Sequence, residues 1–99
     1  MPSSGYAEKA QAYLTECIES LDSAGGIIEC QVTGLPAGIG EPVFQKLDAS
    51  LARGIMSIGA VKGVEIGDGF AAAWSRGSIN NDPFLCQDGE VAKETNHSG

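Results

Sequence analysis

The sequence predicts an α+β fold whose elements follow the order helix, strand, helix, strand, strand. Two long stretches repeat their apolar residues at the spacing of one helix face, and a shorter stretch alternates apolar and polar residues as a half-buried strand does. Glycine-marked turns separate these stretches. The length of 99 residues fits one small domain, and a hydrophobic content of 42% is ordinary for a folded chain.

The first helix is predicted over residues 6–24. Its apolar residues occupy one helix face at the spacing i, i+4, i+7 and i+11, namely Ala10, Leu14, Cys17 and Leu21. Gly25-Gly26 supplies the left-handed backbone conformation that commonly ends a helix. Residues 1–5 precede the helix as a short polar leader, and they lack the basic region and apolar core of a secretory signal.

A strand is predicted over residues 27–33, and a second helix follows it. Apolar residues alternate with polar ones along the strand, at Ile28, Cys30 and Val32. The segment 34–40 is a glycine-rich loop, and Pro42 begins a helix that runs to about Ile58, since the missing N–H of proline costs nothing in a first helical turn. The apolar stripe of this helix consists of Phe44, Leu47, Leu51 and Ile55.

Two further strands are predicted over residues 61–66 and 70–74. Gly67-Asp68-Gly69 offers the positive φ angles of a tight hairpin between them. Residues 79–99 are predicted to be mostly loop, because they are polar and rich in turn-forming residues. The turn signals in this part are Asn80-Asn81-Asp82-Pro83 and Asp88-Gly89.

Charge and cysteine content exclude several classes of function. A net charge of −7 disfavours binding to nucleic acid or to an anionic membrane surface, and no apolar run approaches the length of a membrane span. The three cysteines are widely spaced and His97 is the only histidine, so no metal site is predicted. Reduced cysteines fit a cytoplasmic protein.

Four groups of residues have a conceivable chemical role, and each also has a structural explanation. The loop before Pro42 resembles a phosphate loop in its glycines, yet it lacks the Lys-Ser/Thr of a P-loop. Gly59-Ala60 is typical of a helix stop, although small residues also let a ligand approach the backbone closely. Glu65 and Asp68 form a conceivable acid–base pair, but a strand residue and a hairpin tip explain them. His97 could be a base or a flavin neighbour, and a loop residue is the simpler interpretation.

The stretch from Gly34 to Ala52 resembles the corresponding stretch of chorismate synthases, and the resemblance continues from Met56 to Phe70. Arg76-Gly77-Ser78 and Thr95-Asn96-His97-Ser98-Gly99 also resemble the family in the right order. The similarity spans nearly all 99 residues but only a central part of the family's chain. Residues 1–99 are therefore expected to form a single partial domain.

The resemblance implies an enzyme that converts 5-enolpyruvylshikimate-3-phosphate to chorismate and phosphate, a 1,4-elimination that needs reduced FMN. It also implies a β-α-β sandwich and a homotetramer. In the family, the residue pair at Gly59 and Ala60 lies against the FMN, and Gly59 stands where relatives often have Asn or Pro. No catalytic residue is implied within this stretch.

The isolated chain is expected to be inactive and to bind FMN weakly or not at all. FMN and the substrate are both anions, so their site needs converging cations. This chain offers only Arg53, Lys62 and Arg76, which are scattered along the sequence. The alternative from another class is a small α+β module that binds a partner chain and has no catalytic activity.

Overall fold

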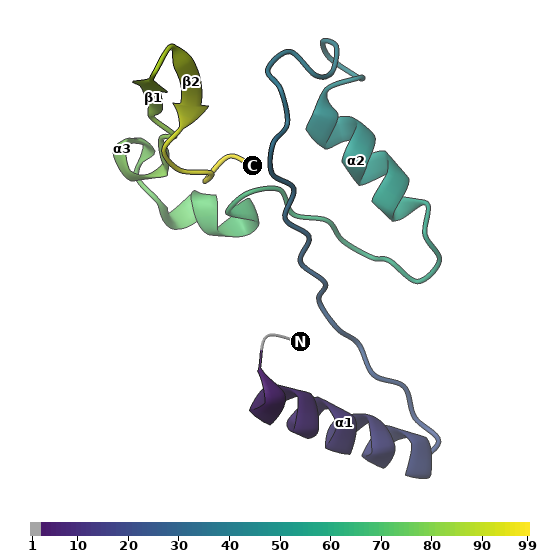
Figure 1. Cartoon of the computed structure of the whole chain (residues 1–99). Helices are drawn as coiled ribbons and strands as arrows, with labels where there is room; N and C mark the ends of the chain where they lie inside the picture. Colours follow the sequence, from purple (N-terminus) through teal and green to yellow (C-terminus); the bar gives the residue numbers. More distant parts are fainter. Residues whose placement is uncertain (1–2) are drawn as a thin grey trace. The chain divides into compact units, whose positions relative to one another are not determined.

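The structure, a computed structural model, describes residues 3–99 (Figure 1). The chain divides into an N-terminal unit, Met1–Gly34, of which residues 3–34 are described, and a C-terminal unit, Leu35–Gly99. The content is mixed, with helices and one two-stranded antiparallel hairpin in the described part. The α+β class is thus confirmed at this level. That residues 1–99 form a single partial domain stays a prediction.

The N-terminal unit contains the helix α1 (Ser4–Glu19). Ser3 caps it, because its Oγ accepts a hydrogen bond from the Tyr6 N–H at 3.4 Å. Ser4 and Gly5 therefore belong to the helix and not to a polar leader, while Met1 and Pro2 lie outside the described residues. The helix ends before Gly25-Gly26, because Leu21 already takes a positive φ of 57°.

The strand predicted over residues 27–33 is absent from the structure, and the chain there has neither helix nor strand. Ile27 and Ile28 are 99% and 96% exposed. An extended segment becomes a strand only when a neighbour pairs with its N–H and C=O groups. Within the described part of the chain no such neighbour is present, so the alternating pattern has nothing to pack against.

The second helix, α2 (Leu47–Met56), begins later than the predicted helix from Pro42. Val43 has a positive φ of 60°, which interrupts any helix across it. The Glu41 N–H donates to the Gln45 carbonyl at 2.9 Å, which closes a turn before the helix. A Cβ on Gly40 would lie 2.9 Å from the Leu47 nitrogen, so this turn requires glycine.

The strands predicted over residues 61–66 and 70–74 are also absent, and a 3-10 helix, η1 (Gly69–Trp74), replaces the second one. Gly67 and Gly69 have the positive φ angles that the sequence predicts, 61° and 56°. At the start of η1 the Glu65 carboxylate accepts the Phe70 N–H at 2.9 Å. Glu65 therefore bonds the backbone of η1 and is not an outward strand residue.

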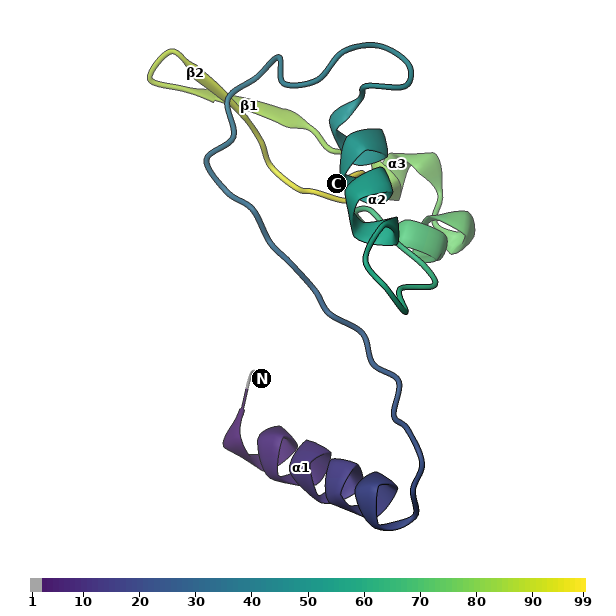
Figure 2. The ribbon, with the colours of Figure 1, turned by 90° about the vertical axis from the view of Figure 1, so that its right-hand side faces the viewer.

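The sheet of the structure lies in residues predicted to be mostly loop. After the short helix α3 (Gly77–Asn80), strands β1 (Phe84–Gln87) and β2 (Glu90–Lys93) pair antiparallel, and Figure 2 shows them side by side. The register places Gln87 opposite Glu90. Asp88 and Gly89 form the two-residue turn with φ angles of 52° and 79°, as a type I′ hairpin needs. Asp88-Gly89 is thus confirmed as a turn.

Apolar burial is small in the described residues. Cys17, at 8% exposure, is the one buried hydrophobic residue among them, whereas Phe44 and Trp74 are 86% and 84% exposed. None of the helices in residues 3–99 has the length and apolar character needed to cross a membrane. The packing that usually stabilises a domain is thus largely missing from this chain alone.

We expect the isolated 99-residue chain to bind the hydrophobic dye ANS strongly and to unfold without a sharp transition. Its apolar side chains are exposed, and a cooperative transition depends on their burial. Dye fluorescence, size-exclusion chromatography and scanning calorimetry would measure this. A monomer with little dye binding and a single sharp calorimetric peak would contradict the expectation.

Candidate functional site

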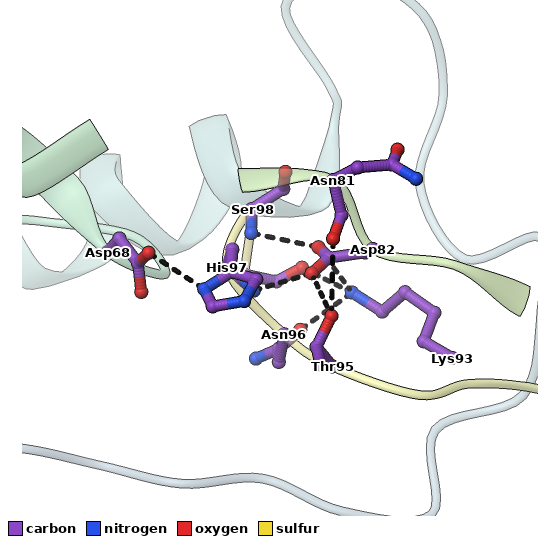
Figure 3. A network of polar contacts seen from close by, with 9 residues as sticks. Asp68, Asn81, Asp82, Lys93, Thr95, Asn96, His97 and Ser98 are labelled. Carbon is purple, nitrogen blue, oxygen red and sulfur yellow. Dashed lines mark hydrogen bonds and ion pairs between the residues drawn. The ribbon is translucent and has the colours of Figure 1, made fainter. Parts of the chain in front are cut away.

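The densest polar cluster of the C-terminal unit surrounds the side chain of Asp82, between α3 and β1 (Figure 3). Its carboxylate accepts hydrogen bonds from the Thr95 hydroxyl at 2.8 Å, the His97 N–H at 2.7 Å and the Ser98 N–H at 2.9 Å. The Lys93 ammonium lies 3.8 Å from the same carboxylate. The side chain of Asp82 is 8% exposed, so these donors replace water around it.

The β1–β2 hairpin explains why these residues meet. Its two strands return the chain to where it started, and the Glu94 N–H donates to the Pro83 carbonyl at 2.8 Å. The residue before β1 therefore faces the residues after β2. We call residues 95–99 the C-terminal strap, because Asp82 fastens them along the chain that precedes β1 (Figure 3).

Hydrogen bonding decides the charge state of Asp82. Burial by itself raises the pKa of this carboxyl. The hydrogen bonds from Ser98, Thr95 and His97 outweigh that effect, the Lys93 charge adds to them, and together they lower the pKa from its ordinary value of 3.8 to about 2. Asp82 is therefore a carboxylate at every physiological pH.

A second pair of contacts joins the C-terminal strap to the turn before η1. The Asp68 carboxylate lies 2.8 Å from Nδ1 of His97, and the Asp68 N–H donates to the His97 carbonyl at 2.7 Å. Gly67 lies against the strap so closely that a Cβ there would overlap backbone atoms of His97, Ser98 and Gly99. Asp68 is thus the partner of His97 and not a hairpin tip.

The strap is also fastened at its end. The Lys93 ammonium donates to Oδ1 of Asn96 at 2.6 Å and to the Gly99 carbonyl at 2.9 Å. A cavity of about 250 Å³ lies beside this end of the strap. Its lining is mainly apolar and comprises Leu47, Asp48, Leu51, Ile66, Ser98 and Gly99.

The predicted flavin contacts, Gly59 and Ala60, lie in an exposed turn after α2. Ala60 has a positive φ of 70°, a strained conformation for a residue with a side chain. A Cβ on Gly59 would meet no atom within 4 Å. Within residues 3–99 neither N–H of this pair donates to a backbone carbonyl, and no hydrogen bond joins the pair to the Asp82 cluster.

The three cationic residues that the sequence analysis named for anion binding form no ion pairs with the residues of the candidate site. In the described residues Arg53, Lys62 and Arg76 form no ion pair, and no group of three potential metal ligands is present there. The glycine-rich loop considered as a phosphate loop ends several residues before α2, which begins only at Leu47. The loop therefore does not lead directly into a helix N-terminus.

Sequence reasoning missed the contacts of Asp82, which it took as part of a turn signal, and it missed the roles of Lys93 and Thr95. A signal was present in the chain. The Asp88-Gly89 turn is a strong hairpin pattern, and a hairpin centred there brings the residues before β1 next to those after β2. Asp82 and the donor-rich strap would then have been expected to meet.

We expect Asp82→Asn to release the C-terminal strap. The carboxylate form is preferred in the folded state, so its contribution to stability is fully present above pH 3.8 and is lost as the pH falls through about 2. In the unsubstituted chain, the amide proton shifts of His97 and Ser98 should therefore titrate with a midpoint near pH 2. Two-dimensional NMR in acid titration, begun near neutral pH, would follow them.

The substituted chain provides the control for this titration. A carboxamide in place of the Asp82 carboxylate cannot ionise, so the acid transition of both amides should disappear. Identical titration curves for the unsubstituted and the Asp82→Asn chains would show that another group controls the strap.

Comparison with known proteins places the chain in a family. The family profile described as chorismate synthase matches residues 1–99. The chorismate synthase of Agathobacter rectalis is 64% identical over 99 residues, which is 100% of this chain and 27% of that protein. The chorismate synthase of Lachnospira eligens is 59% identical over the same share of each chain.

A third relative gives a similar value. The chorismate synthase of Methanosarcina mazei is 62% identical over 78 residues, which is 79% of this chain and 21% of that protein. The chain thus spans about a quarter of the length of the curated relatives that it matches. A match along the whole of residues 1–99 settles the family: the chain belongs to the chorismate synthases.

Proposed function

We propose that this chain is part of an enzyme that converts 5-enolpyruvylshikimate-3-phosphate to chorismate and phosphate. The observation that carries the proposal is the 64% identity to a chorismate synthase along the whole of the chain. The complete fold would be the β-α-β sandwich of the family, assembled as a homotetramer. Exposed apolar side chains such as Ile28 and Phe44 support this, because neighbouring strands and helices would bury them.

Reduced FMN is the cofactor in this proposal, and it supplies electron density for an elimination without net redox change. Gly59 and Ala60 would hold it through their backbone. Their N–H groups have no backbone acceptor within the described residues, and the space beside Gly59 is open. The strained φ of Ala60 supports the same role, since strain of this kind is common at ligand sites.

The anionic groups of the substrate and of FMN would bind mainly to other segments of the complete enzyme. The chain has 13 acidic and 6 basic side chains, so its own field repels anions. The alternative, a non-catalytic binding module, has in its favour only the exposed apolar side chains, which the proposed fold explains as well.

A chimera tests the proposed function. Residues 1–99 would replace the matching 99-residue segment of the Agathobacter rectalis enzyme, and the chimera would be expressed in bacteria that lack chorismate synthase. We expect growth without aromatic amino acids and tight FMN binding by fluorescence titration. The isolated chain should show neither activity nor sub-micromolar FMN binding. A folded chimera without activity would contradict the proposal. Sub-micromolar FMN binding by the isolated chain would instead contradict the expectation that the anion-binding groups lie in other segments of the enzyme.

The turn at Ala60 provides a second prediction. In the chimera, Ala60→Val should weaken FMN binding, because a β-branched side chain tolerates a positive φ less well than alanine does. Ala60→Gly should keep the affinity, since glycine adopts this conformation without strain. Fluorescence titration measures both.

The matched control is Ala73→Val, which makes the same change in η1 where φ is not positive. It should leave FMN binding unchanged. Equal affinities for the Ala60→Val chimera and the unsubstituted chimera would mean that flavin binding does not depend on the conformation of this turn.

A further inference from the structure

His97 is held by three contacts. Its N–H donates to Asp82 at 2.7 Å, its carbonyl accepts the Asp68 N–H at 2.7 Å, and ring Nδ1 lies 2.8 Å from the Asp68 carboxylate (Figure 3). Two of these contacts fix the backbone and the third orients the ring. The side chain is nevertheless 34% exposed, so the ring is oriented without being enclosed.

The contact with Asp68 also fixes the position of the ring proton. A carboxylate only accepts hydrogen bonds, so Nδ1 must carry the proton and donate it to Asp68. In the neutral ring, Nε2 then keeps its lone pair and is an acceptor. Among the described residues Nε2 of His97 has no hydrogen-bond partner.

A histidine with one nitrogen bound to a carboxylate and the other free is arranged as a positioned acceptor. The Asp68 carboxylate contacts the ring itself, whereas the Asp82 carboxylate contacts the backbone and has the Lys93 ammonium 3.8 Å away. A phosphate oxygen at the ring would therefore be repelled mainly by Asp68. A neutral N–H or O–H group suits the site better, because it can donate to Nε2 without adding negative charge.

We propose that His97 accepts a hydrogen bond through Nε2 from a neutral donor group of a bound ligand, with Asp68 and Asp82 as positioning residues. The donor is an N–H of the flavin ring or an O–H of the substrate. This inference rests on the proposed function and adds a contact to it. Asp68 sets the tautomer, and Asp82 sets the backbone that carries the ring.

Asp68→Asn in the chimera is the sharpest test. The carboxamide can donate to Nδ1, which moves the ring proton to Nε2 and turns the acceptor into a donor. Two donors would then face each other, so turnover or ligand affinity should fall about tenfold or more. Asp88→Asn is the matched control, because it makes the same change at the hairpin tip and should have no effect.

Two measurements identify the source of the donor. A weaker FMN affinity with an unchanged substrate KM would assign it to the flavin, and a raised KM or lowered kcat with unchanged FMN affinity would assign it to the substrate.

Imidazole nitrogen NMR spectra of the unsubstituted protein should show the proton on Nδ1, and those of Asp68→Asn should show it on Nε2. His97→Ala removes the ring and its Nε2 acceptor and keeps both backbone contacts, so it should lose activity even where Asp68→Asn misfolds.

Three results would overturn the inference. One is a proton on Nε2 in the unsubstituted protein, and another is full activity and FMN affinity after the proton has moved in Asp68→Asn. The third is a fully active His97→Ala chimera. An unsubstituted chimera that is folded but inactive would instead refute the proposed function, and with it this role of His97.

Discussion

The carboxylate of Asp82 is the group on which the arrangement of the C-terminal strap depends. It accepts hydrogen bonds from Thr95, His97 and Ser98, which are 13 to 16 residues further along the chain. These contacts hold the strap where Asp68 can meet the ring of His97. The donors more than offset the cost of taking the charge out of water, and they lower the pKa of Asp82 to about 2.

Polar contacts define the position of the strap, because apolar contacts are scarce in the C-terminal unit. Among the described residues of the C-terminal unit no hydrophobic side chain is buried, and Phe70 and Phe84 are 76% and 72% exposed. Hydrogen bonds to a fixed carboxylate are directional, so they can define one geometry without a core around them. They add little to global stability unless apolar burial accompanies them, and burial would come from neighbouring strands in the proposed sandwich.

Structural features that depend on residues nearby in the sequence could be predicted from it. Features that depend on pairing with a distant segment could not. Helix α1 and the left-handed glycines at 67 and 69 follow from local spacing and backbone freedom, and the structure has both. The predicted strand at 27–33 is not formed, since its pairing groups find no neighbour within the described chain. Alternation indicates a face that packs in a complete sheet, and it cannot supply the second strand.

The features of the candidate site also fall into those that could be predicted from the sequence and those that could not. Gly59 and Ala60 are identified by resemblance, and the physical sign of strain at Ala60 appears only in the backbone angles. The contacts of Asp82 and Asp68 with the strap join residues that are 13 to 29 positions apart in the sequence. The amino-acid composition does not predict such contacts. The register of the hairpin would have been enough to predict the first of these contacts, since it alone decides which residues lie opposite one another.

In the proposed flavin site, the absence of a side chain at Gly59 leaves only the backbone of this residue to contact the flavin. A backbone contact depends on the local conformation, and that conformation is set by the left-handed Ala60 beside it. In a chain with 13 acidic and 6 basic side chains, electrostatic attraction cannot compensate for a misplaced amide. The contribution of this segment to the proposed flavin site would therefore be geometric, through a strained turn and an oriented imidazole, while the attraction for the anions would come from elsewhere in the enzyme.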